Sequence, residues 1–334
     1  MDLATGREAI APGGAGNLLQ LHQDLPNMWD AWDVDAFYRN TVTDLTGADS
    51  LALTESGGEA ATVEVTRSFG ASRAVQRLTL RAGARVLEVD TDVDWHEREK
   101  ILKAAFPLDV KADSSAAETQ FGHVFRPTHS NTSWEAAKFE ICAHRWIHVA
   151  EPGWGAAVVN DSTYGHDVTR EVREDGGQTT TVRLSLLRAP RYPDPDTDQG
   201  GHRMRYALAP GATIGDAVRE GHWFNLPERV VPGGAAVEPL VTVEDDGQVV
   251  LETVKLADDR GGDVVVRLYE SAGGRARTRL VAGFPLASAT VTDLLERPLA
   301  NVQHPQVADG RAVEVALRPF EIVTYRLRPA APAE

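Results

Sequence analysis

Along most of the chain, hydrophobic and polar residues alternate with a period of two, which predicts β-strands with one buried and one exposed face. Three such runs, separated by turn-forming residues, follow one another between residues 61 and 95. The acidic face of the third run consists of Glu88, Asp90, Asp92 and Asp94. Side chains two residues apart on a flat strand do not converge on one ion, so we interpret this face as solvated rather than as a metal site.

Strand patterns continue towards the end of the chain, and one segment between them is helical in character. The stretch TIGDAVREGHWFN predicts a short helix because Thr213 provides a cap in front of an apolar set with helical spacing. A run rich in proline and glycine, LPERVVPGGAAVEP, follows it and predicts a linker. We therefore expect an all-β protein with a large β-sandwich over residues 1–228, a smaller C-terminal β-sandwich over 236–329 and a disordered tail over 330–334.

The composition agrees with this expectation and narrows the classes of partner. The 334 residues include 29 glycines and 18 prolines, a balance that favours short strands joined by turns. The net charge of −15 argues against a nucleic acid or an anionic membrane surface as a partner, because both carry negative charge. No apolar run approaches the roughly 20 residues that span a bilayer. The first residues, MDLATGREAI, lack the features of a signal peptide, and we expect a cytoplasmic location.

Few residues suggest chemistry by spacing alone. His144 and His148 lie four apart in HRWIH, which would suit a metal pair on a helix, but the surrounding pattern is that of a strand. Positions i and i+4 of a strand are about 13 Å apart, so we expect no metal site there. The single cysteine, Cys142, lies in the alternating run KFEICAHRW, and we expect it to be a small buried residue without a catalytic role.

The segment PNMWDAWDVD places two tryptophans and three aspartates within ten residues. Broad apolar rings next to carboxylates suit a polyhydroxylated ligand, which has C–H faces and an equator of O–H donors. The alternative is a loop whose rings pack on the core and whose aspartates cap turns. The segment alone favours the second interpretation.

Five ordered blocks of the sequence resemble the C-terminal β region of α-mannosidases of glycoside hydrolase family 38, in the branch of bacterial and vacuolar cytosolic-type enzymes. The blocks are NLLQLHQDLPNMWDAWDVDAFY, DWHEREKILKAAFPLDVKAD, QFGHVFRPTHSNTSWEAAKFEICAHRW, EPGWGAAVVNDSTYGHDV and LSLLRAPRYPDPDTDQGGHRMRYAL. The similarity extends from about residue 2 to residue 327. It implies a large sandwich of the galactose-mutarotase type, a supersandwich, followed by a small sandwich.

The resemblance also implies an activity. Members of the family are retaining exo-mannosidases, in which one carboxylate acts as nucleophile, a second as acid/base, and a zinc ion holds the terminal mannose. Retention requires two carboxyl groups about 5–5.5 Å apart. In the family these groups and the zinc ligands belong to an N-terminal α/β barrel and the helical region after it, and no segment here matches either. We therefore expect no catalytic residue, metal ligand or cofactor in this chain, and no activity without the barrel.

The family's β region packs against the barrel and lends loops to the sugar site, so α-mannoside glycans are the expected ligands. A separate chain carrying the barrel is an expected partner, and an exposed former interface would favour self-association. For the first loop, a substrate-facing or interdomain role and simple packing are equally favoured; for the other two, packing is favoured. The candidate substrate-binding residues are Trp29, Asp30, Trp32 and Asp33 in the first loop, Arg126, His129, Asn131 and Trp134 in the second, and Asn160, Asp161 and Tyr164 in the third.

Two other functions compete with this one. The chain could be a stand-alone carbohydrate-binding β module, although such a module should not leave a barrel-facing surface open. It could also be an aldose epimerase, because the large sandwich of the family resembles aldose mutarotases. That chemistry needs a histidine acid and a glutamate base that converge, and no glutamate in the histidine-rich loops pairs obviously with one.

Overall fold

A computed structural model describes residues 1–226, 228–244 and 247–331, which form two compact units. The first unit comprises Met1–Glu118 and Val124–Pro227, and the second comprises Thr119–His123 and Glu228–Glu334. Strands far outweigh helices among the described residues, and a large β unit precedes a smaller β-sandwich, so the predicted fold class is confirmed.

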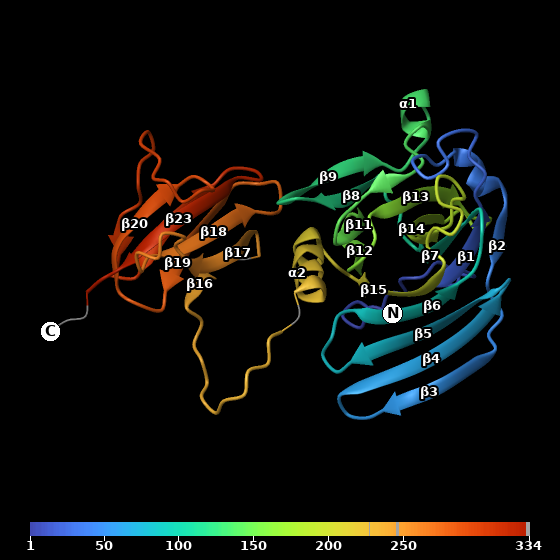
Figure 1. The fold of residues 1–334 in the computed structure, drawn as a ribbon, viewed down its shortest axis with the longest axis horizontal. Helices are drawn as coiled ribbons and strands as arrows, with labels where there is room; N and C mark the ends of the chain where they lie inside the picture. The colour runs from blue at the N-terminus through green and yellow to red at the C-terminus, as the bar shows by residue number, and fades with distance from the viewer. Residues whose placement is uncertain (227, 245–246, 332–334) are drawn as a thin grey trace. The chain divides into compact units, whose positions relative to one another are not determined.

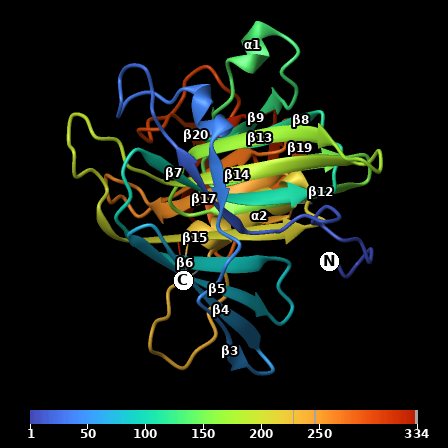
Figure 2. The same ribbon diagram turned by 90° about the vertical axis from the view of Figure 1, so that its right-hand side faces the viewer.

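One layer of the first unit is a six-stranded antiparallel sheet with the order β10-β13-β14-β7-β1-β2 (Figures 1 and 2). Its strands are β1 (Leu18–Gln23), β2 (Val42–Asp44), β7 (Lys100–Leu108), β10 (Ile141–Cys142), β13 (Gly165–Val172) and β14 (Gln178–Arg188). Between β1 and β2 the chain makes a long loop that contains the 3-10 helix η1 (Ala36–Asn40). This loop carries the two tryptophans of PNMWDAWDVD.

The other layer is a nine-stranded antiparallel sheet with the order β3-β4-β5-β6-β15-β12-β11-β8-β9. Its strands are β3 (Ser50–Ser56), β4 (Ala60–Phe69), β5 (Ser72–Arg81), β6 (Leu87–Trp95), β8 (Ser114–Thr119), β9 (Gly122–Pro127), β11 (Trp146–Glu151), β12 (Trp154–Asn160) and β15 (Gly200–Pro210). The acidic face of β6 points outward, and arginines of the flanking strands pair with it, Arg77 with Asp92 at 2.7 Å and Arg203 with Asp90.

The core of the first unit lies between the two sheets, and the strand alternation creates it. In β7, Leu102, Phe106 and Leu108 are fully buried on the inner face. Phe106 meets Tyr206 of the opposite sheet edge to face, with ring centroids 6.1 Å apart. Burying each such side chain contributes about 1.5–3 kcal/mol. Lys103 lies on the other face of β7, which is the outer face of the six-stranded sheet, yet its side chain is fully buried.

Helix α2 (Ile214–Asn225) packs on β11 and β12, on the outer face of the nine-stranded sheet (Figure 1). Its predicted cap is confirmed, because the Thr213 hydroxyl accepts from the Asp216 N–H at 3.1 Å and the Asp216 carboxylate accepts from the Thr213 N–H at 2.9 Å. This reciprocal pair satisfies two backbone donors at the start of the helix. Gly221 allows the close approach, since a Cβ there would lie 2.8 Å from Cδ1 of Trp146.

The second unit is a sandwich of two four-stranded antiparallel sheets, β16-β19-β22-β21 and β17-β18-β23-β20. Their strands are β16 (Val241–Glu244), β17 (Val249–Leu256), β18 (Val264–Glu270), β19 (Ala276–Ala282), β20 (Leu286–Thr292), β21 (Val307–Ala308), β22 (Ala312–Leu317) and β23 (Ile322–Pro329). Alternate residues fill the space between the sheets, with Val266, Leu268, Val313 and Leu327 fully buried.

The tip between β8 and β9 also belongs to the second unit, which no boundary in the sequence indicates. Phe121 packs edge to face on Tyr269 at 5.5 Å, and His123 does so on Phe320 at 5.1 Å. Gly122 makes room for Phe320, because a Cβ there would lie 2.7 Å from that ring. At the other end of the unit, residues 332–334 of the predicted disordered tail lie outside the described residues.

Cys142 is exposed, so its predicted burial is wrong; β10 is only two residues long and lies at the edge of its sheet. His148 lies on β11, as the strand pattern predicts, and its Nε2 is 2.8 Å from the Ala212 carbonyl oxygen. Among the described residues, no helix has the length and apolar character to cross a membrane.

Candidate functional site

The loop between β1 and β2 presents its aromatic rings to solvent. Trp29 is 64% exposed and Trp32 is 66% exposed, and the Trp32 ring lies 6.3 Å from that of Tyr192. Trp29 has a positive φ of 59°, an uncommon conformation for a residue with a side chain. The N–H groups of Trp32 and Asp33 both donate to the Trp29 carbonyl at 2.8 Å. A tight turn therefore holds two large apolar faces outward.

The aspartates of the same loop accept hydrogen bonds from backbone N–H groups. Asp30 accepts from the backbone N–H groups of Arg191 at 2.7 Å and Tyr192 at 2.9 Å. Asp33 accepts from the N–H of Val34 at 2.9 Å. Each interpretation of PNMWDAWDVD therefore holds in part: the carboxylates organise the turn, and the rings stay exposed.

The second predicted group lies on and after β9. The Nη1 atom of Arg126 is buried and has no hydrogen-bond partner among the described residues. The ring of His129 accepts from the N–H of Asn131 at 3.4 Å, and Asn131 is exposed. Trp134 belongs to the one-turn helix α1 (Ser133–Ala136) and is 78% exposed. Apart from Arg126, these side chains form an exposed loop.

The third predicted group separates into a turn and an exposed ring. Asn160 is buried, and its side-chain oxygen accepts from the N–H groups of Ser162 and Thr163 at 3.1 and 2.9 Å. Asp161 accepts from the N–H of Arg205 on β15 at 3.0 Å. Tyr164 is 60% exposed and meets His144 edge to face at 5.1 Å. The roles of all three groups in binding stay predictions.

Under the first loop lies a buried polar cluster that was not predicted from the sequence. Lys103 is fully buried, and its ammonium donates to Asp167 at 2.8 Å, to the Tyr38 hydroxyl at 3.0 Å and to Glu140. Tyr38 lies on η1, and its hydroxyl donates to Glu140 at 2.5 Å. Arg183 donates to the second oxygen of Asp167 at 2.9 Å. The only hint in the sequence is a lysine within the apolar run KILKAAFPL.

The cluster joins the first loop to the segment after α1. Arg39, next to Tyr38 on η1, donates to the carbonyl of Phe139, and the rings of Tyr38 and Phe139 are 6.5 Å apart. The Tyr38 ring also lies 4.5 Å from the Lys103 ammonium and 5.2 Å from the ring of His22. The structure therefore brings together the segments that follow the first two predicted groups, while Asp161 bonds to β15 of the other sheet.

Burial and neighbouring charges act in opposite directions on the pKa values of the cluster. Burial opposes ionisation of Asp167, but the cations of Lys103 and Arg183 outweigh it and hold the pKa of Asp167 below its usual range. Burial likewise opposes the charged form of Lys103, and the neighbouring carboxylates raise its pKa. Burial raises the pKa of Tyr38 to about 12. Burial also raises the pKa of Glu140, which the Lys103 ammonium only partly offsets. The contacts of the cluster anchor η1 and the loop to the sheet.

Two buried histidines of the first unit have weakened basicity. Burial lowers the pKa of His22 and that of His166 to about 4. His166 is fully buried; its Nδ1 lies 3.0 Å from the Tyr164 carbonyl oxygen, and its Nε2 has no partner among the described residues. Both rings are therefore neutral at physiological pH and contribute as uncharged hydrogen-bonding groups.

The zinc ion that the resemblance implies does not fit the described part of this chain. Within residues 1–226, 228–244 and 247–331, no three His, Cys, Asp or Glu side chains converge in a way that could hold a metal ion. Glu88, Asp90 and Asp92 of β6 pair with arginines instead.

Two family sequence models match this chain. The sequence model described as "Glycosyl hydrolases family 38 C-terminal domain" matches residues 1–196, and the model of the family's C-terminal beta sandwich domain matches residues 248–325. The chain therefore belongs to glycosyl hydrolase family 38, in the part that these C-terminal domains form.

Individual relatives support this assignment. Over 97% of its length the chain is 37% identical to Alpha-mannosidase 2C1 of Homo sapiens, of which it covers 31%. It is 29% identical to Alpha-mannosidase of Saccharomyces cerevisiae over 98% of this chain and 32% of the yeast protein. The chain thus spans about a third of the curated relatives it matches. An α-mannosidase structure from Enterococcus faecalis V583 has the same fold, with a TM-score of 0.70 and 15% identity over 92% of this chain and 38% of that chain.

Proposed function

We propose that this chain provides the C-terminal β portion of a retaining α-mannosidase, with the loop at Trp29 and Trp32 forming part of the wall of a mannoside site. The observation that carries the proposal is the exposure of these two rings, on a loop fastened by Asp30 to the backbone at Arg191, in a member of glycosyl hydrolase family 38. An exposed aromatic face can stack on the C–H face of a sugar.

In this proposal the chain shapes the site and another region performs the chemistry. The nucleophile, the acid/base and the zinc ligands belong to an N-terminal barrel, supplied by a separate chain or a connected one, in the cytoplasm. The buried Lys103 cluster supports the wall, because Tyr38 and Arg39 follow the tryptophan loop directly and are tied to the sheet through Asp167. Double displacement at the anomeric carbon then needs two carboxylates from the barrel.

A stand-alone carbohydrate-binding module is the second candidate function, and the exposed rings favour it as well. The two functions differ in whether Trp29 and Trp32 bind a sugar without the barrel. A module would bind α-mannosides through Trp29 and Trp32 without the barrel, whereas a wall would bind them weakly until the barrel completes the pocket.

Turnover by the purified chain tests the proposal. The chain is incubated with p-nitrophenyl α-mannoside and either zinc or cobalt, and release of p-nitrophenol is followed. We expect no release above the rate without protein. Turnover at an ordinary enzymatic rate, about 1–1,000 per second, would show that catalytic groups are present in the chain itself.

A further inference from the structure

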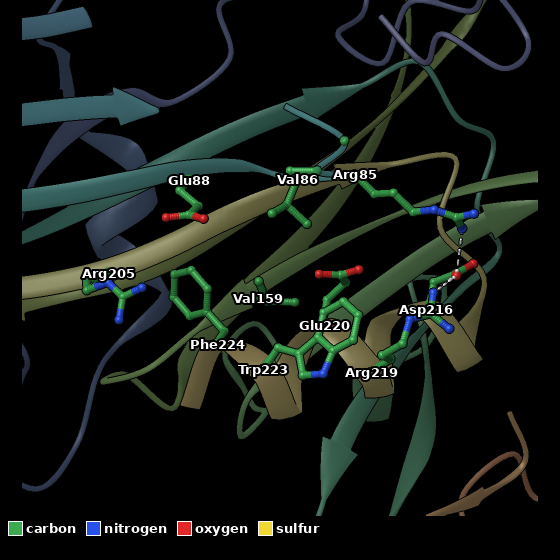
Figure 3. Close-up of a pocket in the computed structure, with 12 residues that line it drawn as sticks. Arg85, Val86, Glu88, Val159, Arg205, Asp216, Arg219, Glu220, Trp223 and Phe224 are labelled. Atoms are coloured by element: carbon green, nitrogen blue, oxygen red, sulfur yellow. Dashed lines mark hydrogen bonds and ion pairs between the residues drawn. The ribbon is translucent and has the colours of Figure 1, made fainter. Parts of the chain in front are cut away.

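A pocket of about 530 Å³ opens beside α2 on the outer face of the nine-stranded sheet (Figure 3). Val86 and Glu88 line it at the start of β6, Val159 lines it from β12, and α2 contributes Glu220, Trp223 and Phe224. Its volume lies in the range of about 300–1,000 Å³ that small-molecule sites occupy. The tryptophan loop belongs to the opposite layer of the sandwich, so the two sites are distinct.

Glu220 is the feature of this pocket that calls for a ligand. The residue is only 8% exposed, and no hydrogen bond or ion pair of its carboxyl group is found within the described ranges. Figure 3 shows the side chain rising from α2 into the pocket, towards Val159 and Val86. Burial raises the pKa of Glu220, and the negative charge of Asp216 raises it further. The positive charges of Arg219 and Arg85 lower it, but not enough to cancel these effects. A hydrogen bond from an O–H or N–H group of a ligand would offset the cost of burying this carboxyl group.

Two aromatic residues flank this carboxyl group. Trp223 lies one turn after Glu220 on α2 and is 67% exposed; the Arg219 guanidinium lies 5.9 Å from its ring centroid, and much of the ring faces the mouth of the pocket. Phe224 is nearly buried, and the guanidinium of Arg205 lies 4.5 Å from its ring centroid. A flat ligand with C–H faces could therefore lie against Trp223 while its polar rim reaches Glu220.

The charges around the pocket favour a neutral ligand. Three arginines, Arg85, Arg205 and Arg219, balance three acidic residues, Glu88, Asp216 and Glu220. Most are already engaged: Asp216 binds both Arg85, at 3.2 Å, and Arg219. A phosphate would meet the three carboxyl groups and a polyamine would meet the three guanidinium groups, so neither is favoured.

A second hollow of about 290 Å³ adjoins the pocket and shares Glu88, Arg205 and Phe224 with it. This hollow extends over β5 and β6, where Arg77, Arg81 and Asp90 line it. The ligand space is thus longer than one ring, and its far end offers hydrogen-bond donors and acceptors rather than apolar surface.

We propose that the pocket beside α2 binds a neutral saccharide of at least two pyranose units, with one ring stacked on Trp223, its hydroxyls bonded to Glu220, and the next unit in the hollow over β6. Such a site would hold part of a glycan on the face away from the tryptophan loop. The proposal rests on the pocket and its residues alone, and it stands whether or not the chain serves in an α-mannosidase.

Sugar titration of the full chain tests the proposal. Mannobiose, maltose, cellobiose and chitobiose are the neutral probes, glucose 6-phosphate and glucosamine are the charged ones, and binding is followed by saturation-transfer NMR and tryptophan fluorescence. We expect at least one neutral disaccharide to bind with a Kd of about 1 mM, and the charged sugars to bind more weakly.

Variants decide whether binding occurs at this pocket. Trp223→Ala and Glu220→Ala should each weaken binding about tenfold, while Glu220→Gln keeps a hydrogen-bonding group and should weaken it less. Leu295→Ala removes a 70% exposed apolar side chain of the second unit and serves as the control that should bind as the wild type does. Thermal unfolding midpoints confirm that each variant folds. The proposal is wrong if no neutral disaccharide binds at about 10 mM, or if Trp223→Ala leaves binding unchanged.

Discussion

At the scale of single residues, Lys103 shows how a charge can be kept inside this protein. Its ammonium has lost all contact with water, and two carboxylates and the Tyr38 hydroxyl replace that water. A buried ion pair need not stabilise a protein relative to an apolar replacement of the whole cluster. Removing Lys103 alone is different, because it takes the ammonium from Glu140 and one of the neighbouring cations from the buried Asp167.

The variant Lys103→Met tests this arrangement. It keeps the length of the side chain but leaves Asp167 and Glu140 facing each other, so the free energy of unfolding should fall by about 3–5 kcal/mol in urea titrations. Lys111→Met is the matched control, because the Lys111 side chain is 57% exposed and its ammonium lies 3.9 Å from Asp113. The control should change stability by no more than about 0.5 kcal/mol. Equal stabilities of the two variants would contradict the assigned role of the cluster.

The buried His166 predicts a pH dependence of stability. Burial lowers its pKa from 6.5 to about 4, so between these values the unfolded chain binds a proton that the folded chain does not. The free energy of unfolding should therefore fall as the pH drops from about 6.5 to about 4, by about 1.4 kcal/mol per pH unit for this residue. His166→Gln should reduce the slope by that amount, whatever its effect at pH 7. An unchanged slope in the variant would contradict the prediction.

At the scale of elements, α2 connects the sheet to the pocket beside it. Its capping box fixes where the helix begins, and therefore which side chains of the helix face Val86 and Glu88. Thr213→Ala removes one half of the box and should lower the free energy of unfolding by about 1 kcal/mol, whereas Thr213→Ser should retain most of it. Chemical denaturation of both variants measures the difference, and no loss in Thr213→Ala would show that the cap is dispensable.

The elements also show what the sequence can and cannot predict. The strands and α2 follow from the sequence because their signals are local: alternation within a strand, and Thr213 three residues before Asp216. The Lys103 cluster could not be predicted, because Glu140 and Asp167 lie 37 and 64 residues away along the chain. The prediction for Cys142 failed because alternation indicates a strand but not its place at a sheet edge.

The candidate loops were predictable in position but not in orientation. Tryptophan and aspartate in PNMWDAWDVD are compatible both with packing and with ligand contact, and the outcome depends on where Asp30 finds its donors. Those donors belong to residues 191 and 192, about 160 residues later. Likewise, nothing near Glu220 in sequence shows that Val159 and Val86 come together around it.

At the scale of the whole molecule, two β units cover about a third of the curated relatives, and the described residues bring no metal-binding group of acidic, histidine or cysteine side chains together. We propose a division of labour in which this chain shapes a wall with exposed rings and a barrel supplies the reacting groups. The account places Trp29 and Trp32 against the substrate only when both parts are assembled.

Reconstitution with a barrel measures this division most directly. The chain is mixed with the N-terminal region of a related α-mannosidase, with zinc present, and hydrolysis of p-nitrophenyl α-mannoside is compared for each part alone and for the mixture. We expect turnover in the mixture only, with KM raised about tenfold by Trp29→Ala/Trp32→Ala and unchanged by the control Leu295→Ala, which removes an exposed side chain of the second unit. Turnover by this chain alone, or barrel activity that does not respond to the chain, would contradict the account.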